Sequence, residues 1–139
     1  MIDNELQNNL AGNSEEIDRS SENIEFIPVC NSNELYEGKG KKIQFPEDDD
    51  FQVAIFRVNG KLYCLENICP HRHADSIFDG IIKNGVVTCP LHGWSYFLAN
   101  GQNVNQRQGI KSLKSFKIKE ENNIIYIEKP EFSIPKWRR

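Results

Sequence analysis

The chain has 139 residues, of which 38% are hydrophobic and 27% are charged, and its formal net charge is −3. This length suits one domain with a modest core. The negative charge, without basic residues interleaved with exposed aromatics, argues against nucleic-acid binding. No stretch approaches the roughly 18 apolar residues that a membrane span needs. We therefore expect a cytoplasmic protein with no nucleic-acid and no membrane partner.

The N-terminal segment differs in composition from the rest of the chain. Residues 1–22 contain six acidic residues against one arginine, and none of them is aromatic. Such a segment cannot bury enough apolar surface to fold alone. We predict a disordered acidic arm over residues 1–22, a folded domain over 23–129 and a C-terminal tail over 130–139.

Short apolar segments and frequent turn signals make up the folded part. The strands predicted in chain order are 24–30, 41–45, 51–58, 61–65, 81–83, 86–88, 94–98, 113–119 and 124–128, with a helical turn over 33–37 and an acidic turn over 46–50. Asn-Gly pairs at 59–60, 84–85 and 100–101 predict tight type I′ hairpins, and Asn122-Asn123 predicts the last turn. Strands this short, with turns this frequent, indicate an antiparallel all-β sandwich or barrel.

The histidines of the chain all lie between His71 and His92, together with two of its four cysteines. They form two similar pairs, Cys69-Pro70-His71 and Cys89-Pro90-Leu91-His92, separated by 17 residues. The intervening segment contains the predicted hairpin at 84–85, which brings its own two ends together. We therefore expect two neighbouring loops, each offering one thiolate and one imidazole.

Two sulfur and two nitrogen ligands are compatible with two kinds of metal site. One is a single tetrahedral zinc ion. The other is a [2Fe–2S] cluster with two thiolates on one iron and two imidazoles on the other. Zinc sites of this composition usually place cysteines beside cysteines, whereas each pair here mixes Cys with His. The mixture favours the cluster and leaves zinc as the alternative.

The motifs CPH and CPLHGW, at this spacing, resemble those of Rieske-type proteins. The upstream VNGKLYCLENICPH and the downstream WSYFLANG extend the resemblance over residues 24–128. It implies an antiparallel Rieske-type sandwich or barrel with a cluster-binding hairpin subdomain, and one [2Fe–2S] cluster. By resemblance, Cys69 and Cys89 bind the inner iron, and His71 and His92 bind the outer iron near the surface.

The resemblance also indicates a subgroup. High-potential members have an extra cysteine in each loop, where this chain has Ala74 and Leu91. They also have a serine that donates a hydrogen bond to the cluster, where this chain has Trp94. Fewer donors near the sulfurs imply a potential on the order of −150 mV. A hydroxyl of Tyr96 that reached Cys69 or Cys89 would raise that value.

The chain has no room for the mononuclear-iron domain of a ring-hydroxylating oxygenase. The resemblance therefore implies an electron-transfer component rather than an enzyme: a ferredoxin that carries single electrons from a reductase to a terminal oxygenase or reductase. The first alternative is the small Rieske subunit of a nitrite reductase-type enzyme. The second is a zinc-stabilised interaction module or redox sensor.

The remaining thiols and the third histidine are expected to have ordinary roles. Cys30 and Cys64 lie on predicted strands and are interpreted as core thiols. His73 is interpreted as an exposed loop residue rather than a ligand, in a position where a partner would dock.

Overall fold

A computed structural model describes residues 24–68, 75–91, 93–105 and 111–132. Its elements are β1 (Phe26–Asn31), η1 (Ser32–Glu34), β2 (Lys39–Phe45), β3 (Asp48–Val58), β4 (Lys61–Glu66), η2 (Ile77–Asp79), β5 (Ile81–Lys83), β6 (Val86–Thr88), β7 (Ser95–Phe97), β8 (Ile118–Glu121) and β9 (Ile124–Glu128). The predicted all-β class is confirmed. The predicted arm and most of the predicted tail lie outside the described residues, so these boundaries stay predictions.

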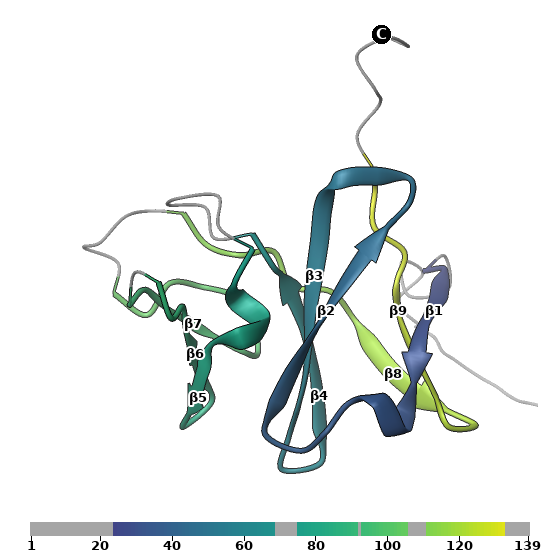
Figure 1. The fold of residues 1–139 in the computed structure, drawn as a ribbon, viewed down its shortest axis with the longest axis horizontal. Helices are drawn as coiled ribbons and strands as arrows, with labels where there is room; N and C mark the ends of the chain where they lie inside the picture. The colour runs from purple at the N-terminus through teal and green to yellow at the C-terminus, as the bar shows by residue number, and fades with distance from the viewer. Residues whose placement is uncertain (1–23, 69–74, 92, 106–110, 133–139) are drawn as a thin grey trace, which may run out of the picture.

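The strands form three antiparallel sheets of three strands each, with the orders β1-β9-β8, β2-β3-β4 and β5-β6-β7. Figure 1 shows the β2-β3-β4 sheet in the middle, with the β1-β9-β8 sheet on one side and the short β5-β6-β7 sheet on the other. The first two sheets make up a base, and the third is a separate hairpin subdomain. This is the division that the sequence predicted.

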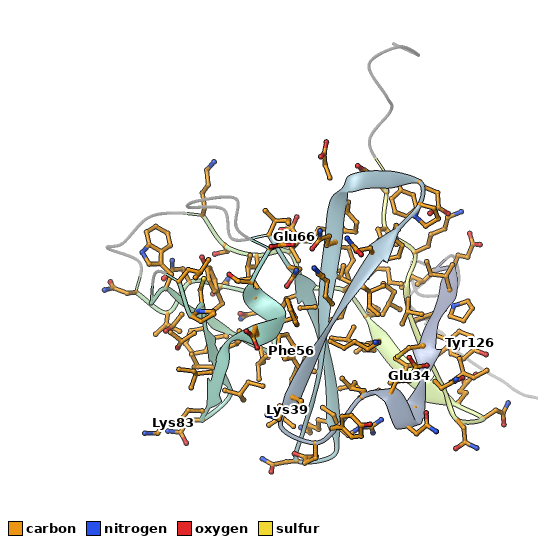
Figure 2. All side chains as sticks on the ribbon, viewed as in Figure 1. Glu34, Lys39, Phe56, Glu66, Lys83 and Tyr126 are labelled. Carbon is orange, nitrogen blue, oxygen red and sulfur yellow. The ribbon has the colours of Figure 1, made fainter. Side chains whose placement is uncertain are left out.

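Two apolar cores lie on opposite faces of the central strand β3. Val53 and Ile55 belong to the base core, which also contains residues of β2, β4 and β9. Ala54 and Phe56 belong to a second core, which also contains residues of η2, β6 and β7. Successive strand residues point to opposite faces, so the continuous apolar run of β3 supplies both cores. Phe56 lies on the side of β3 that faces η2 (Figure 2).

Three predicted two-residue turns are confirmed by their backbone angles. Asn59-Gly60, Asn84-Gly85 and Asn122-Asn123 have φ between 52° and 79° at both positions. Positive φ at both central residues defines the type I′ turn, and asparagine and glycine tolerate that conformation best. These turns fix the registers of β3 with β4, β5 with β6 and β8 with β9.

Three local predictions are wrong. Asn100-Gly101 does not form a two-residue hairpin, because only Gly101 of the pair has positive φ. The turn is longer, and it is closed by hydrogen bonds from the Gly101 N–H to the Phe97 carbonyl and from the Phe97 N–H to the Gln102 carbonyl. Residues 113–117 are not strand apart from one bridge between Ser115 and Leu65, and β8 begins only at Ile118. The acidic turn is shorter than predicted, since β3 already begins at Asp48.

The apolar segments of this fold are strands rather than long helices. Among the described residues, no helix has the length and apolar character that crossing a bilayer requires.

Candidate metal centre

The second predicted ligand loop begins where β6 ends, at Cys89. Two backbone hydrogen bonds close this loop: Cys89 N–H donates to the Trp94 carbonyl at 2.7 Å, and Gly93 N–H donates to the Cys89 carbonyl at 2.9 Å. Gly93 has a φ of +72°, in the left-handed region that glycine adopts without steric cost. The loop is therefore a tight, hydrogen-bonded turn.

Burial differs sharply along this loop. The Cys89 side chain is 1% exposed and belongs to the core shared by η2, β6 and β7, whereas Leu91 is 63% exposed. The cysteine is thus an inner residue and the loop tip faces outward. His92 lies outside the described residues, so its predicted position at the surface is not tested.

The first predicted ligand loop has both of its ends anchored to one residue, Asn67. The side chain of Asn67 donates from Nδ2 to the Gln52 Oε1 at 2.8 Å and to the Asp75 carbonyl at 3.1 Å, and its Oδ1 accepts from the Phe78 N–H at 2.7 Å. Its backbone carbonyl also accepts from the Ile77 N–H at 3.4 Å. The chain therefore returns at residues 75–78 to the point that it left at residue 67.

Cys69 and His71 lie between these two anchors but outside the described residues. What the structure fixes is the base of their loop. Sequence analysis missed Asn67, which is completely buried. Its only signal was an asparagine two residues before Cys69, and one polar residue at the end of a strand does not distinguish a buried clamp from an exposed turn.

The two loop bases meet directly. The Ser76 hydroxyl oxygen lies 3.3 Å from the Cys89 sulfur. The approach is helped by Gly80, where an added Cβ would lie 2.6 Å from the Val87 Cγ2 and 2.7 Å from the Thr88 carbonyl oxygen. Glycine thus allows the segment after the first loop to rest on β6. The segment that follows the first loop therefore touches the start of the second loop at one end of the hairpin subdomain, and the convergence of the four predicted ligands stays a prediction.

Two aromatic residues follow the second loop. Tyr96 is fully buried in the same core as Cys89, and Trp94 packs against that core. Together with Val87 and Leu98, they give the Cys89 side of the site an apolar surrounding. The Trp94 backbone carbonyl also accepts the hydrogen bond that closes the second loop.

The other described cysteines lie in the base. Cys64 is buried in the base core, and desolvation raises the pKa of its thiol well above the usual value. Cys30 is half-buried against the same core. Its burial raises the pKa of its thiol, and the nearby Glu34 carboxylate raises it further. A raised thiol pKa opposes formation of the thiolate that binds metals. Both behave as the core thiols that the sequence predicted.

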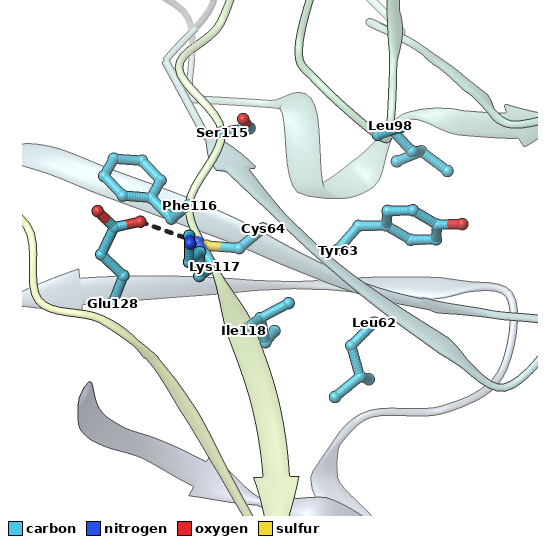
Figure 3. A pocket seen from close by; sticks show the side chains of 10 residues that line it. Leu62, Tyr63, Cys64, Leu98, Ser115, Phe116, Lys117, Ile118 and Glu128 are labelled. Atoms are coloured by element: carbon cyan, nitrogen blue, oxygen red, sulfur yellow. Dashed lines mark hydrogen bonds between the residues drawn. The ribbon is translucent and has the colours of Figure 1, made fainter. Parts of the chain in front are cut away.

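A cavity of about 420 Å³ lies beside Cys64, between β4 and the segment that leads into β8 (Figure 3). Leu62, Phe116 and Ile118 line it, and Glu128 at its edge accepts a hydrogen bond from the Lys117 N–H at 3.0 Å. The cavity belongs to the base and not to the Cys89 site. Within the described part of the chain, no group of three or more His, Cys, Asp or Glu side chains is placed to hold a metal ion.

The described residues fit a sulfur-ligated iron cluster at the loop bases. A buried thiol stands at the start of a loop that backbone hydrogen bonds close, apolar side chains surround it, and a hydroxyl group contacts its sulfur. Partial burial and hydrogen bonds to the sulfurs are the features by which proteins tune such clusters.

Comparison with known proteins decides the family. The model of the family described as "Rieske [2Fe-2S] domain" matches residues 25–117. This chain belongs to the Rieske [2Fe–2S] domain family. It therefore binds one [2Fe–2S] cluster and is an electron-transfer protein.

Relatives of this Rieske domain include a free-standing ferredoxin and a part of a larger enzyme. The ferredoxin component of the alkene monooxygenase system of Xanthobacter autotrophicus is 26% identical over 106 residues, which cover 76% of this chain and 83% of the relative. The NAD(P)H nitrite reductase of Emericella nidulans is 35% identical over 89 residues, which cover 58% of this chain but only 8% of that enzyme.

A solved structure confirms the fold. The ferredoxin of Sphingomonas yanoikuyae B1 superposes with a TM-score of 0.66 and 21% identity, covering 76% of this chain and all of that ferredoxin. The predicted Rieske-type architecture is thus confirmed.

Proposed function

We propose that this Rieske domain is the ferredoxin of a multicomponent system, which accepts single electrons from a reductase and delivers them to a terminal oxygenase or reductase. The observation that carries the proposal is the graded burial of the second loop, from the enclosed Cys89 to the exposed Leu91. Such a gradient leaves one end of the site open to a docking partner. The alkene monooxygenase ferredoxin, which this chain matches along most of its length, supports a free-standing carrier.

The proposed ligands are Cys69 and Cys89 for the inner iron, and His71 and His92 for the outer iron. When bound, the cluster supplies reversible one-electron chemistry. The described residues would serve it in three ways. The closed turn over residues 89–94 fixes the direction of the Cys89 side chain, Asn67 fixes the base of the first loop, and the core around Tyr96 keeps water from the inner sulfur.

A second candidate function is an electron-relay subunit of a nitrite reductase-type enzyme. It is favoured by the nitrite reductase relative, which is 35% identical over the matched residues. The two candidates differ in their partners. A purified reductase that reduces the isolated chain, followed by electron delivery to a separate oxygenase, would support the first. Stable co-purification with a sirohaem protein would support the second. The cytoplasmic location stays a prediction.

The ligand set is tested by metal analysis and by electron paramagnetic resonance (EPR) of the reduced protein. We expect two irons per chain and a reduced-state signal whose average g value lies clearly below that of the free electron, as mixed Cys and His ligation produces. His92→Ala and Cys89→Ala should abolish this signal. His73→Ala, a change of a neighbouring histidine outside the proposed set, should retain it.

Two outcomes would contradict the proposal. Stoichiometric zinc in a colourless protein would contradict the iron–sulfur cluster and would support the zinc-stabilised interaction module. An unchanged optical and EPR spectrum in His92→Ala would remove His92 from the ligand set.

A further inference from the structure

The contact between Ser76 and Cys89 is not explained by the local backbone. Ser76 is the N-cap residue of η2, where a serine usually accepts a hydrogen bond from a backbone N–H of the first helical turn. Among the described residues, no side-chain capping bond of this kind is present. The hydroxyl oxygen instead lies 3.3 Å from the Cys89 sulfur, in a partly buried position. The side chain is therefore directed at the sulfur rather than at the helix.

The metal-bound state fixes the direction of this hydrogen bond. A free thiol and a hydroxyl can each donate to the other, but a cysteine that binds metal does so as a thiolate, which has no proton to donate. With Cys89 as a ligand, the Ser76 hydroxyl must be the donor and the sulfur the acceptor. Hydrogen bonds to ionised acceptors are stronger than those between neutral groups.

Ser76 is held in place from both sides. Asn67 binds the carbonyl of the preceding residue, Asp75, and the N–H of the following residue, Ile77. The Ser76 carbonyl accepts a hydrogen bond from the Asp79 N–H at 3.1 Å. A donor whose backbone is fixed in this way loses little conformational freedom when it binds the sulfur.

We propose that Ser76 is a positioning residue that donates a hydrogen bond to the Cys89 sulfur and thereby raises the reduction potential of the cluster. This inference rests on the proposed ligand role of Cys89. Reduction adds one electron, supplied by the reductase, to the iron pair, and no proton leaves Ser76. The added negative charge is spread partly onto the sulfur ligands, so a donor to that sulfur stabilises the reduced state more than the oxidised state.

The proposal changes an expectation drawn from the sequence. Trp94 occupies the position where high-potential relatives have a donating serine, and this predicted a potential at the low end of the Rieske range. Ser76 supplies a hydroxyl to the inner ligand from the opposite loop. The potential of this protein should therefore lie above the low-end value.

The test compares Ser76→Ala with Ser76→Thr and with the control Ser95→Ala, all as full-length, cluster-loaded chains. Ser95 also carries a hydroxyl near the end of the second loop, but it pairs with the Thr88 hydroxyl at 2.7 Å rather than with a sulfur. In a spectroscopic redox titration, Ser76→Ala should make reduction about tenfold less favourable, a shift of about −59 mV for one electron. Ser76→Thr and Ser95→Ala should stay close to the wild type.

A second measurement keeps the proposal testable if Ser76→Ala does not retain its cluster. The iron–sulfur stretching bands of the wild-type protein should shift on transfer from H₂O to D₂O, and Ser76→Cys, a weaker donor, should reduce that shift and lower the potential in part. Potentials and isotope shifts in Ser76→Ala or Ser76→Cys equal to the wild type would overturn the role of Ser76. Cluster retention in Cys89→Ala would instead overturn the ligand assignment itself.

Discussion

At the scale of single residues, Asn67 does more to shape the site than any described residue other than Cys89. Its side-chain amide satisfies Gln52, Asp75 and Phe78 at once, although it is completely buried. A buried polar group is stable only when its hydrogen bonds are made. Because its partners lie before and after the first ligand loop, the same bonds that stabilise Asn67 also close that loop.

Asn67→Ala should therefore lower both stability and cluster retention. The change leaves the Gln52 Oε1, the Asp75 carbonyl and the Phe78 N–H without their partner, at a cost of about 3 kcal/mol in the free energy of unfolding. Chemical denaturation measures this cost, and iron content after gel filtration measures retention. The control Asn100→Ala removes an exposed bond from the Gln102 N–H and should cost less than about 1 kcal/mol. If the two changes lowered stability and iron content equally, the proposed role of Asn67 in closing the first ligand loop would be contradicted.

At the scale of elements, the tight turns could be predicted from the sequence, whereas the long-range hydrogen bonds could not. Asn-Gly and Asn-Asn turns are determined by the two residues themselves, which is why the turns at 59–60, 84–85 and 122–123 were predicted. The turn around Gly101 failed as a prediction because its geometry depends on a close approach of the Leu113 carbonyl. The segment 113–117 is bound to the end of β4 by hydrogen bonds from the Phe116 N–H to the Cys64 carbonyl and from the Glu66 N–H to the Lys114 carbonyl. No sequence pattern reveals that partner.

Arg57 on β3 is an example of such a long-range link between sheets. Its guanidinium donates to both carboxylate oxygens of Glu120 on β8, at 3.1 and 3.2 Å, and to the carbonyls of Ser32 and Leu35. The hydrogen bond to Glu120 raises the pKa of Arg57. The hydrogen bonds that Glu120 accepts from Arg57 lower the pKa of its carboxyl.

Arg57→Met should cost about 1–2 kcal/mol at neutral pH, mostly from the two carbonyls that lose their donor, because a partly exposed ion pair contributes little. The pKa of Glu120 is lower in the folded than in the unfolded state, so its contribution to the free energy of unfolding is complete at a pH above its unfolded-state pKa of about 4.5. That contribution is lost as the pH falls through the folded-state pKa. In Arg57→Met, the Glu120 pKa measured by NMR titration should rise towards 4.5. The control Glu121→Gln removes an exposed pair with Lys119 and should leave the pKa of Glu120 unchanged.

At the scale of the whole molecule, the two apolar cores stabilise different parts of the fold. The base core joins the sheets β1-β9-β8 and β2-β3-β4, and the second core holds η2 and the β5-β6-β7 sheet against the other face of β3. The resemblance to Rieske-type proteins implied a cluster-binding hairpin subdomain, and the hairpin at 84–85 predicted that its two loops would be neighbours. The sequence could not predict that Asn67 would close the first loop or that Ser76 would contact Cys89 of the second loop, since those contacts depend on how the subdomain rests on β3. The positions of Cys69, His71 and His92 stay predictions.

Removal of the cluster should therefore loosen one part of the molecule and spare the other. Sheet β5-β6-β7 has strands of only three residues, and sheets that small depend on packing for their stability. After chelation of iron, amide hydrogen exchange in β5, β6 and β7 should accelerate by about tenfold or more, which corresponds to a loss of about 1.4 kcal/mol of local stability. The amides of β3 and β9 should keep their protection from exchange.

Ile125→Ala in the base core is the matched control. It should cost about 2–5 kcal/mol and reduce protection in β9 without changing the optical spectrum of the cluster. Uniform acceleration across all three sheets on chelation would contradict two separable cores, because a single cooperative unit responds as a whole.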